Sequence, residues 1–152
     1  MHAVQETRFE IDPSFELEAF LEQPLVARVA TAGPTLRPVW YLWDGGCFWW
    51  LTGRWARLSE LLDDNPRVAV VVDTCDLATG RVLQVTASGE ARIVPFDPDR
   101  ACRKLVRYLG PDKELWDEGF TSGTFGDPST RFVRLAPTTI RPRDLSFTVR
   151  SP

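Results

Sequence analysis

Histidine is almost absent from this sequence of 152 residues, which contains only His2. Ser-His-Asp and Cys-His catalysis, haem ligation by an internal histidine and His-rich metal cages all need imidazole groups inside the folded domain. His2 belongs to residues 1–11, for which we predict a mobile tail because chain ends are poorly ordered unless something ties them down. The sequence therefore excludes these mechanisms and predicts no metal site.

Cysteine is also scarce, and the three cysteines, Cys47, Cys75 and Cys102, are odd in number and far apart. A disulfide framework or a zinc site needs an even set or a CxxC pair. The N-terminus lacks the basic start and apolar run of a signal peptide, and no stretch approaches the roughly 18 apolar residues that span a bilayer. We therefore expect three reduced thiols, no membrane contact and a cytoplasmic protein.

A basic excess is missing too, since the net charge is −3. A protein that binds a phosphate backbone needs a basic excess or a basic stripe, so we expect no nucleic-acid partner. The hydrophobic fraction of 43% and the charged fraction of 26% are ordinary for a globular protein, and the length suits a single domain over residues 1–152. Six tryptophans are unusual in so short a chain, and four of them lie between residues 40 and 50.

Alternating and β-branched stretches predict a mainly β fold with inserted helices. Helices are expected between residues 12 and 24, 55 and 65, and 97 and 110, and Gly89 is expected to mark a bend or bulge. About six strands that follow one another by hairpins indicate a closed, six-stranded antiparallel barrel. Seven stretches show a strand pattern, from which we expect about six strands in the barrel; they are residues 25–31, 36–43, 47–52, 68–72, 82–94, 131–135 and 138–142.

The pattern Thr-x-Arg-x-x-Arg occupies residues 52–57, where the periodicity changes from strand to helix. The first amides of a helix have no partners within it, and the helix dipole favours an anion there. The Thr52 hydroxyl can donate a hydrogen bond, and Gly53 allows a close backbone approach. Arg54 and Arg57 can donate charge-assisted hydrogen bonds to phosphate oxygens. The residue types favour a phosphate site, and the alternative is a solvated helix start with two surface arginines.

The preceding aromatic strand, residues 36–43, offers an edge to a flat ligand. Pro38 leaves a gap in the hydrogen-bond ladder, so the strand should lie at a sheet edge or opposite a bulge. An aromatic ligand against this backbone could receive hydrogen bonds along its rim. The alternative, which we prefer for Trp43, Trp49 and Trp50 taken singly, is an aromatic core and dimer interface. Alternation gives one face with Arg37, Val39, Tyr41 and Trp43 and another with Leu36, Pro38, Trp40 and Leu42.

Five stretches follow one another in a specific order, namely LVARVAT, LRPVWYLWDGGCFWWLTGRWARL, NPRVAVVVD, VTASGEARIV and RYLG. In this order and spacing, over residues 16–142, they resemble the pyridoxamine 5′-phosphate oxidase-like family of flavin-binding split barrels. The resemblance implies a six-stranded antiparallel split β-barrel that forms a homodimer. It also implies a flavin in each of two clefts between the subunits.

The same resemblance implies which residues bind the flavin. Residues 37–40 would line the isoalloxazine ring, and residues 52–57 would hold the phosphate. Leu58 stands at a binding position where many members carry lysine, so one positive charge is missing. Gln84 lies on a strand that often faces the flavin, and Trp116 would reach the cofactor of the partner subunit. The expected cofactor-binding set is Arg37, Pro38, Val39, Trp40, Thr52, Gly53, Arg54, Arg57, Leu58, Gln84 and Trp116.

Members of this family bind FMN, the deazaflavin F420 or tetrapyrroles such as haem. We expect FMN, because acidic N-terminal residues would repel the polyanionic tail of F420 and because an internal histidine for haem is missing. The expected function is an FMN-dependent oxidoreductase for a small organic substrate, in which the flavin N5 transfers hydride or electrons and no side chain is catalytic. An F420-dependent reductase and a non-catalytic flavin carrier or scaffold dimer are the alternatives. The acidic residues are Glu6, Glu10, Asp12, Glu16, Glu18 and Glu22.

Overall fold

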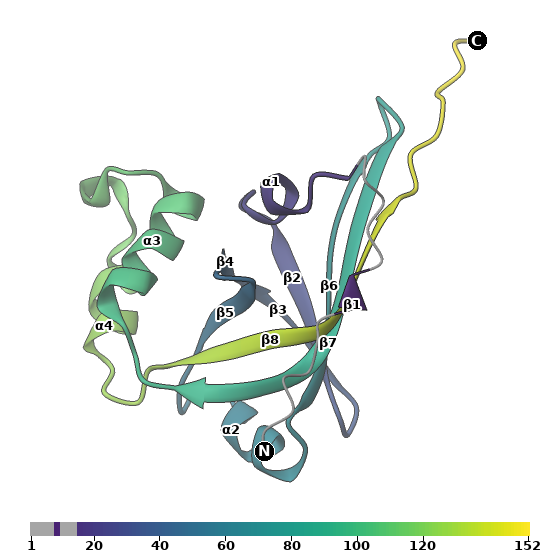
Figure 1. Ribbon diagram of the computed structural model, residues 1–152. Helices are drawn as coiled ribbons and strands as arrows, with labels where there is room; N and C mark the ends of the chain where they lie inside the picture. Colours follow the sequence, from purple (N-terminus) through teal and green to yellow (C-terminus); the bar gives the residue numbers. More distant parts are fainter. Residues whose placement is uncertain (1–7, 10–14) are drawn as a thin grey trace.

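One curled, mostly antiparallel β-sheet organises the computed structural model, which describes residues 8–9 and 15–152 (Figure 1). Its strands are β1 (Arg8–Phe9), β2 (Val26–Thr31), β3 (Thr35–Trp40), β4 (Leu42–Asp44), β5 (Cys47–Thr52), β6 (Arg67–Asp76), β7 (Arg81–Val94) and β8 (Arg131–Asp144). Their order is β3-β2-β6-β7-β8-β5-β4, and β1 joins β8 in parallel. The expected mainly β fold with inserted helices is confirmed. The expected count of six strands is wrong, since the described residues form eight. Apart from β1, the tail expected over residues 1–11 lies outside the described residues.

The aromatic strand expected over residues 36–43 is two strands, because the chain leaves the ladder at Tyr41. The Tyr41 N–H donates to the Tyr108 hydroxyl at 3.0 Å. The same hydroxyl lies 2.6 Å from the Leu25 carbonyl oxygen and 3.1 Å from that of Tyr41. A side chain thus satisfies backbone groups that a neighbouring strand would otherwise bind. The break allows β3 and β4 to lie at opposite ends of the sheet order.

The last two strands expected, residues 131–135 and 138–142, form the single strand β8. Its pairing with β7 shifts register between Ser88 and Gly89. A Cβ added to Gly89 would lie 2.8 Å from the carbonyl oxygen of Ala136. The bend expected at Gly89 is confirmed, and the close approach of β8 explains why the position lacks a side chain.

Helix α3 begins and ends where the sequence predicts. The Asp97 carboxylate accepts hydrogen bonds from the N–H groups of Asp99 and Arg100 at 3.0 and 3.2 Å, and Gly110 follows the last turn with a φ of 90°. None of the helices in the described residues is long and apolar enough to cross a membrane. The helical segments are α1 (Leu17–Leu21), α2 (Leu58–Asp64), α3 (Pro98–Leu109), η1 (Lys113–Leu115), η2 (Gly119–Gly123) and α4 (Thr124–Gly126).

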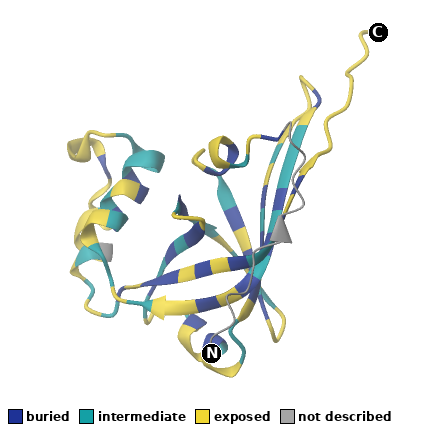
Figure 2. Cartoon of the chain, in the orientation of Figure 1, coloured by how far each residue is buried: buried dark blue, intermediate teal, exposed yellow. Residues whose placement is uncertain are grey.

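The hydrophobic core fills the inside of the curled sheet. Buried residues are interspersed with exposed ones along the strands, as Figure 2 shows for β8. Trp43 and Trp50 are 6% and 1% exposed and belong to the core cluster. The packing role preferred for these two tryptophans is therefore confirmed. Trp49 instead lies under the Arg100 guanidinium, whose central carbon is 3.6 Å from the ring centroid.

Candidate functional site

A cavity of about 460 Å³ opens between β3 and the end of β5. Small-molecule sites typically enclose roughly 300–1,000 Å³, so the cavity can hold a cofactor or a substrate. The segment before α2 and one residue of α3 complete its wall. The lining residues are Leu36, Arg37, Pro38, Val39, Trp40, Trp50, Leu51, Thr52, Trp55, Ala56, Leu58 and Lys104.

The cavity lies where the sheet stays open. β3 ends the sheet order, so among the described strands it pairs only with β2. The edge position expected from Pro38 is therefore confirmed. β5 pairs with β8, but β4 covers only residues 47–49 on its other side. Residues 50–52 consequently have one open edge, and backbone groups on open edges need partners. A ligand between the two edges can supply them.

Six of the eleven residues expected to bind a cofactor line this cavity. They are Arg37, Pro38, Val39, Trp40, Thr52 and Leu58. The structure thus unites the strand expected to face the ring with the start of the segment expected to hold the phosphate. The remaining five, which lie outside the lining, are Gly53, Arg54, Arg57, Gln84 and Trp116.

Three buried polar atoms in the cavity lining have no hydrogen-bond partner: Arg37 Nε, Trp50 Nε1 and Thr52 Oγ1. Only one other such atom, Arg100 Nε, occurs in the part of the chain that the structure describes. A buried polar group left unpaired costs about 1–3 kcal/mol, so native proteins contain few of them. The three residues share one cavity, so a polar ligand bound there is a candidate partner for these atoms.

Lys104 of α3 adds a buried ammonium group that the sequence reasoning missed. Its side chain is 5% exposed and makes no hydrogen bond or ion pair with any described residue. Burial lowers the pKa of Lys104 to about 8, because the charged form loses its hydration. The signal in the sequence was helical spacing, which places Lys104 beside Ala101 and Leu105 on the buried face of α3. Among the residues that the structure describes, Arg37 and Lys104 are the only charged ones in the lining, so this part of the cavity favours an anion.

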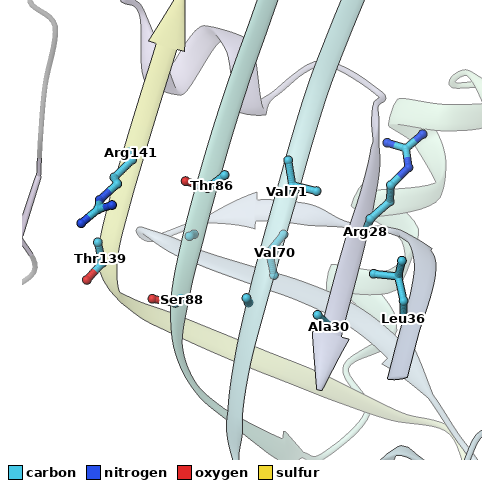
Figure 3. Close-up of a pocket in the computed structure, with 11 residues that line it drawn as sticks. Arg28, Ala30, Leu36, Val70, Val71, Thr86, Ser88, Thr139 and Arg141 are labelled. Atoms are coloured by element: carbon cyan, nitrogen blue, oxygen red, sulfur yellow. The ribbon is translucent and has the colours of Figure 1, made fainter. Parts of the chain in front are cut away.

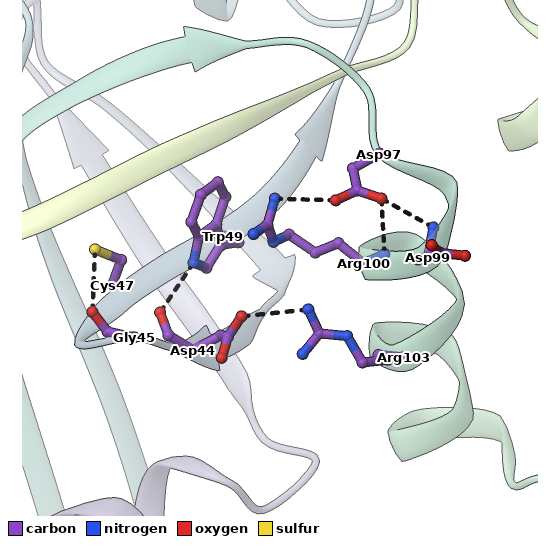
Figure 4. Close-up of polar contacts among 8 residues, drawn as sticks. All are labelled: Asp44, Gly45, Cys47, Trp49, Asp97, Asp99, Arg100 and Arg103. Carbon is purple, nitrogen blue, oxygen red and sulfur yellow. Dashed lines mark hydrogen bonds and ion pairs between the residues drawn. The ribbon is translucent and has the colours of Figure 1, made fainter.

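Helix α3 is fixed against the hairpin of β4 and β5 by two arginines (Figure 4). Arg103 pairs with the Asp44 carboxylate at 3.3 Å, and Arg100 covers the ring of Trp49. One turn after Lys104, the hydroxyl of Tyr108 accepts a hydrogen bond from the Tyr41 N–H at the break between β3 and β4. This contact holds the next turn of α3. These contacts lie on both sides of Lys104 along α3 and fix its place in the cavity wall.

Trp40 lines the cavity and also joins β3 to two helical segments. Its ring stacks with that of Tyr108, with centroids 4.5 Å apart and planes 3° apart. It stacks in the same way with Phe120 of η2, at 5.4 Å and 8°. Stacked aromatic pairs contribute about 0.5–1.5 kcal/mol beyond their buried area. Trp40 therefore has a packing role in addition to its expected position at the ligand.

The helix start expected directly after β5 is wrong. Residues 53–57 form turns, in which the Ala56 N–H donates to the Gly53 carbonyl at 3.0 Å, and α2 begins only at Leu58. The first helical turn therefore begins at Leu58, which lines the cavity, and not directly after Thr52. At Gly53 an added Cβ would lie 2.2 Å from a ring carbon of Trp55, so the close approach expected at this glycine is made by an indole.

Arg54 and Arg57 point to solvent and form ion pairs with acidic neighbours. Arg54 lies 3.4 Å from Asp127, and Arg57 lies 3.2 Å from Glu60. Hydrogen bonds from Ser129, and then the contact with Arg54, lower the pKa of Asp127. The two arginine side chains are 70% and 87% exposed. Their contact with a phosphate stays a prediction.

Comparison with known proteins agrees with this architecture. Residues 14–144 match the family model described as pyridoxamine 5′-phosphate oxidase. The chain belongs to this family. No curated protein matches the sequence significantly.

Three solved structures illustrate the fold of the pyridoxamine 5′-phosphate oxidase family in this chain. A conserved hypothetical protein from Mycobacterium tuberculosis gives a TM-score of 0.68 at 23% identity, with 90% of this chain and 91% of that chain covered. A FAD-binding protein from Mesorhizobium loti gives 0.61 at 20% identity, with 88% and 95% covered. An F420 reductase gives 0.57 at 26% identity, with 83% and 96% covered.

The family resemblance implied that Gln84 and Trp116 bind the cofactor, but both residues lie outside the cavity lining. Gln84 is on β7, where Val85 and Ala87 face the core and Gln84 lies on the opposite face. Trp116 is 8% exposed, and its Nε1 donates to the Gly110 carbonyl oxygen at 3.0 Å. Contact of Gln84 with the flavin, and of Trp116 with the cofactor of the partner subunit, stays a prediction.

The outer face of the sheet carries a shallow groove of about 410 Å³. Figure 3 shows it crossing β2, β6, β7 and β8, with small or apolar side chains such as Ala30, Val71 and Ser88. Leu36 is 70% exposed and lines both this groove and the cavity. The two hollows therefore adjoin at Leu36.

Proposed function

We propose that this protein is an FMN-dependent oxidoreductase whose cofactor occupies the cavity between β3 and β5. The observation that carries the proposal is that three residues lining this cavity have a buried polar atom without a hydrogen-bond partner and that buried Lys104 lines it too. FMN offers ring carbonyl and nitrogen atoms together with a charged phosphate. Its chemistry therefore matches the donors that the lining leaves without partners.

The two sides of the cavity suit different parts of FMN. Residues 37–40 offer an open backbone edge and the Arg37 guanidinium to the isoalloxazine ring, and Thr52 offers its hydroxyl to the phosphate side. Exposed ion pairs contribute little stability, so Arg54 and Arg57 can exchange their carboxylate partners for a phosphate. Bound FMN supplies hydride or electron transfer at its N5. The residues of the chain bind and orient it and exclude water.

Flavin binding can be tested by titrating the protein with FMN and following flavin fluorescence. Thr52→Val keeps the side-chain shape and removes the unpaired hydroxyl. We expect it to weaken FMN binding by about tenfold or more, because hydrogen bonds to charged groups contribute about 1.5–3 kcal/mol. Thr74→Val on β6, outside the cavity lining, is the matched control and should bind FMN like the wild type. Equal affinity of the Thr52 variant and the wild type would contradict this placement of the cofactor.

Colour separates the enzyme from a carrier or scaffold. A yellow preparation with flavin absorbance supports cofactor binding, whereas a chain that binds no flavin would be a scaffold. Bleaching of the bound flavin by NAD(P)H, followed by recovery in air, supports an oxidoreductase. Stable colour in the presence of every reductant tested would favour a flavin carrier.

We further propose that the protein forms a homodimer through the outer groove. Small and apolar side chains across four strands, with Arg28 and Arg141 at the two sides of the groove (Figure 3), favour packing against another chain. The groove adjoins the cofactor cavity at Leu36. Val71→Glu places a charge in the groove and should shift the mass measured by light scattering from dimer to monomer. Thr79→Glu, in an exposed turn, is the control. A wild-type monomer at high concentration would refute the proposal.

F420 is the second candidate cofactor, because an F420 reductase shares 26% identity with this chain over 96% of its own length. Both cofactors present a fused ring and a phosphate-bearing tail. Exposed Glu16 and Glu22 lie in the acidic N-terminal part and disfavour the longer anionic tail. We expect FMN to bind more tightly than F420 in parallel fluorescence titrations, and the opposite ranking would make this chain an F420-dependent reductase.

A further inference from the structure

We propose that Lys104 is the buried cation that binds the phosphate group of the flavin in the cavity between β3 and β5. This inference rests on the proposed function and adds to it a binding residue from α3. That helix lies outside both segments to which sequence reasoning assigned the cofactor.

Among the described residues, no ion pair neutralises the ammonium group of Lys104. Lys104 is 5% exposed, and Thr52, in the same lining, is 4% exposed with an unpaired Oγ1. Burying an unpaired charge is unfavourable, and buried cations are normally matched by a carboxylate or another anion. Among the described residues, the lining contains no carboxylate. We therefore infer that a bound anion neutralises the ammonium group.

The charge distribution around Lys104 favours a phosphate over the flavin ring. Within the described part of the chain, Arg37 on β3 is the only other charged residue in the lining, and β5 and the segment before α2 contribute none. On α3 itself, Arg100 and Tyr108 lie one turn to either side. Oxidised FMN carries its full negative charge on the phosphate, whose second pKa is about 6 for phosphate monoesters. Riboflavin has the same ring but no phosphate. Comparison of FMN with riboflavin therefore distinguishes contact with the phosphate from contact with the ring.

Binding to Lys104 should also take up protons. Burial lowers the pKa of Lys104 to about 8 in the free protein, and an adjacent phosphate would raise it again. Above about pH 8 the free protein has lost part of this charge. FMN affinity should therefore fall with rising pH in the wild type, whereas riboflavin affinity should not.

The scarcity of lysine allows a direct test. Lys104 and Lys113 are the only lysines in the chain, and Lys113 is exposed. Labelling with ¹³C-lysine gives two side-chain signals whose titration is followed by NMR with FMN, riboflavin or inorganic phosphate. We expect FMN and inorganic phosphate to raise the pKa of Lys104, riboflavin to leave it unchanged, and Lys113 to respond to none of them. A Lys104 titration that FMN does not move, or that riboflavin moves equally, would overturn the proposal.

Substitution provides the second measurement. Lys104→Met should lower FMN affinity by about 30-fold or more, since loss of one partner from a buried charged contact costs at least about 2 kcal/mol. Riboflavin affinity should change by less than about threefold. Lys113→Met is the matched control, and Lys104→Arg should retain part of the FMN affinity because it keeps the charge. Equal losses for FMN and riboflavin would contradict a phosphate contact.

The two proposals can fail separately. A wild-type protein that binds neither flavin refutes the proposed function. The titration with inorganic phosphate then decides the role of Lys104 alone: a raised Lys104 pKa supports an anion site, and an unchanged pKa refutes it. A protein that binds FMN with an unchanged Lys104 signal keeps the proposed function and loses the assignment of the lysine.

Discussion

Replacement of Lys104 by methionine should stabilise the ligand-free protein at neutral pH, and this gain should shrink as the pH rises. Burial lowers the pKa of Lys104 from its ordinary value of 10.5 to about 8. Each pKa unit corresponds to about 1.4 kcal/mol, so the buried charge destabilises the folded state by about 3 kcal/mol. The unfolded chain binds the proton more tightly than the folded one. The penalty is therefore complete below about pH 8, decreases between about pH 8 and 10.5, and is absent above that range.

Urea unfolding of wild type, Lys104→Met and Lys113→Met at about pH 7, 8, 9 and 10 measures this penalty. The stability gain of the Lys104 variant over wild type should be largest at about pH 7 and should decline steadily above pH 8. Burial raises the pKa of Tyr41 and of Tyr108, so both lose their stabilising contribution as the pH rises above about 10. These losses occur in every variant and cancel in the difference.

A pH-independent difference between wild type and Lys104→Met would refute the reasoning. It would mean that water reaches the ammonium in solution and that the only effect of methionine is a change in packing. The Lys113 variant should show no pH-dependent difference, because its side chain is exposed. A pH-dependent difference in that control would point to the unfolded state as its source.

Other positions give equally specific expectations. Thr52→Val should leave the ligand-free protein as stable as wild type or up to about 3 kcal/mol more stable in thermal melts, because it removes an unpaired buried hydroxyl. Gly89→Ala should cost about 1–3 kcal/mol in urea unfolding, since its Cβ would lie 2.8 Å from a main-chain oxygen of β8; Gly123→Ala, with open space around its Cβ, should be tolerated. Tyr108→Phe should cost about 1–3 kcal/mol by urea unfolding, because the Tyr41 N–H loses its acceptor.

Local chemistry was sufficient to predict the open side of the sheet. Proline at position 38 has no N–H for a second ladder, and β3 does end the sheet order. Alternation placed Val39 and Tyr41 on one face, and the structure packs both against or within the core. The part of the site that depends on strand periodicity and on a missing amide could therefore be predicted from residues 36–43 alone.

Contacts between distant segments could not be predicted in this way. The break between β3 and β4 requires Tyr108, which lies 67 positions after Tyr41, and no local pattern links the two. The start of α2 depends on a turn at Gly53 that competes with the first helical turn. The strand break and the later start of α2 were therefore missed, and contact of Arg54 and Arg57 with a phosphate stays a prediction.

Lys104 shows why a functional group can contradict the pattern that surrounds it. The stripe of Ala101 and Leu105 calls for an apolar residue at this position, and an apolar residue would make the free protein more stable. The unpaired hydroxyl of Thr52, which lines the same cavity, also makes the free protein less stable than an apolar side chain would. A role in packing alone would leave their destabilising effect on the folded protein uncompensated. If they bind a ligand, the free energy of binding offsets that effect. FMN should then raise the melting temperature of the wild type more than that of a Lys104→Met, Thr52→Val double variant at equal concentration, because stabilisation by a ligand follows its affinity for the folded state. Equal thermal shifts would place the flavin outside this cavity.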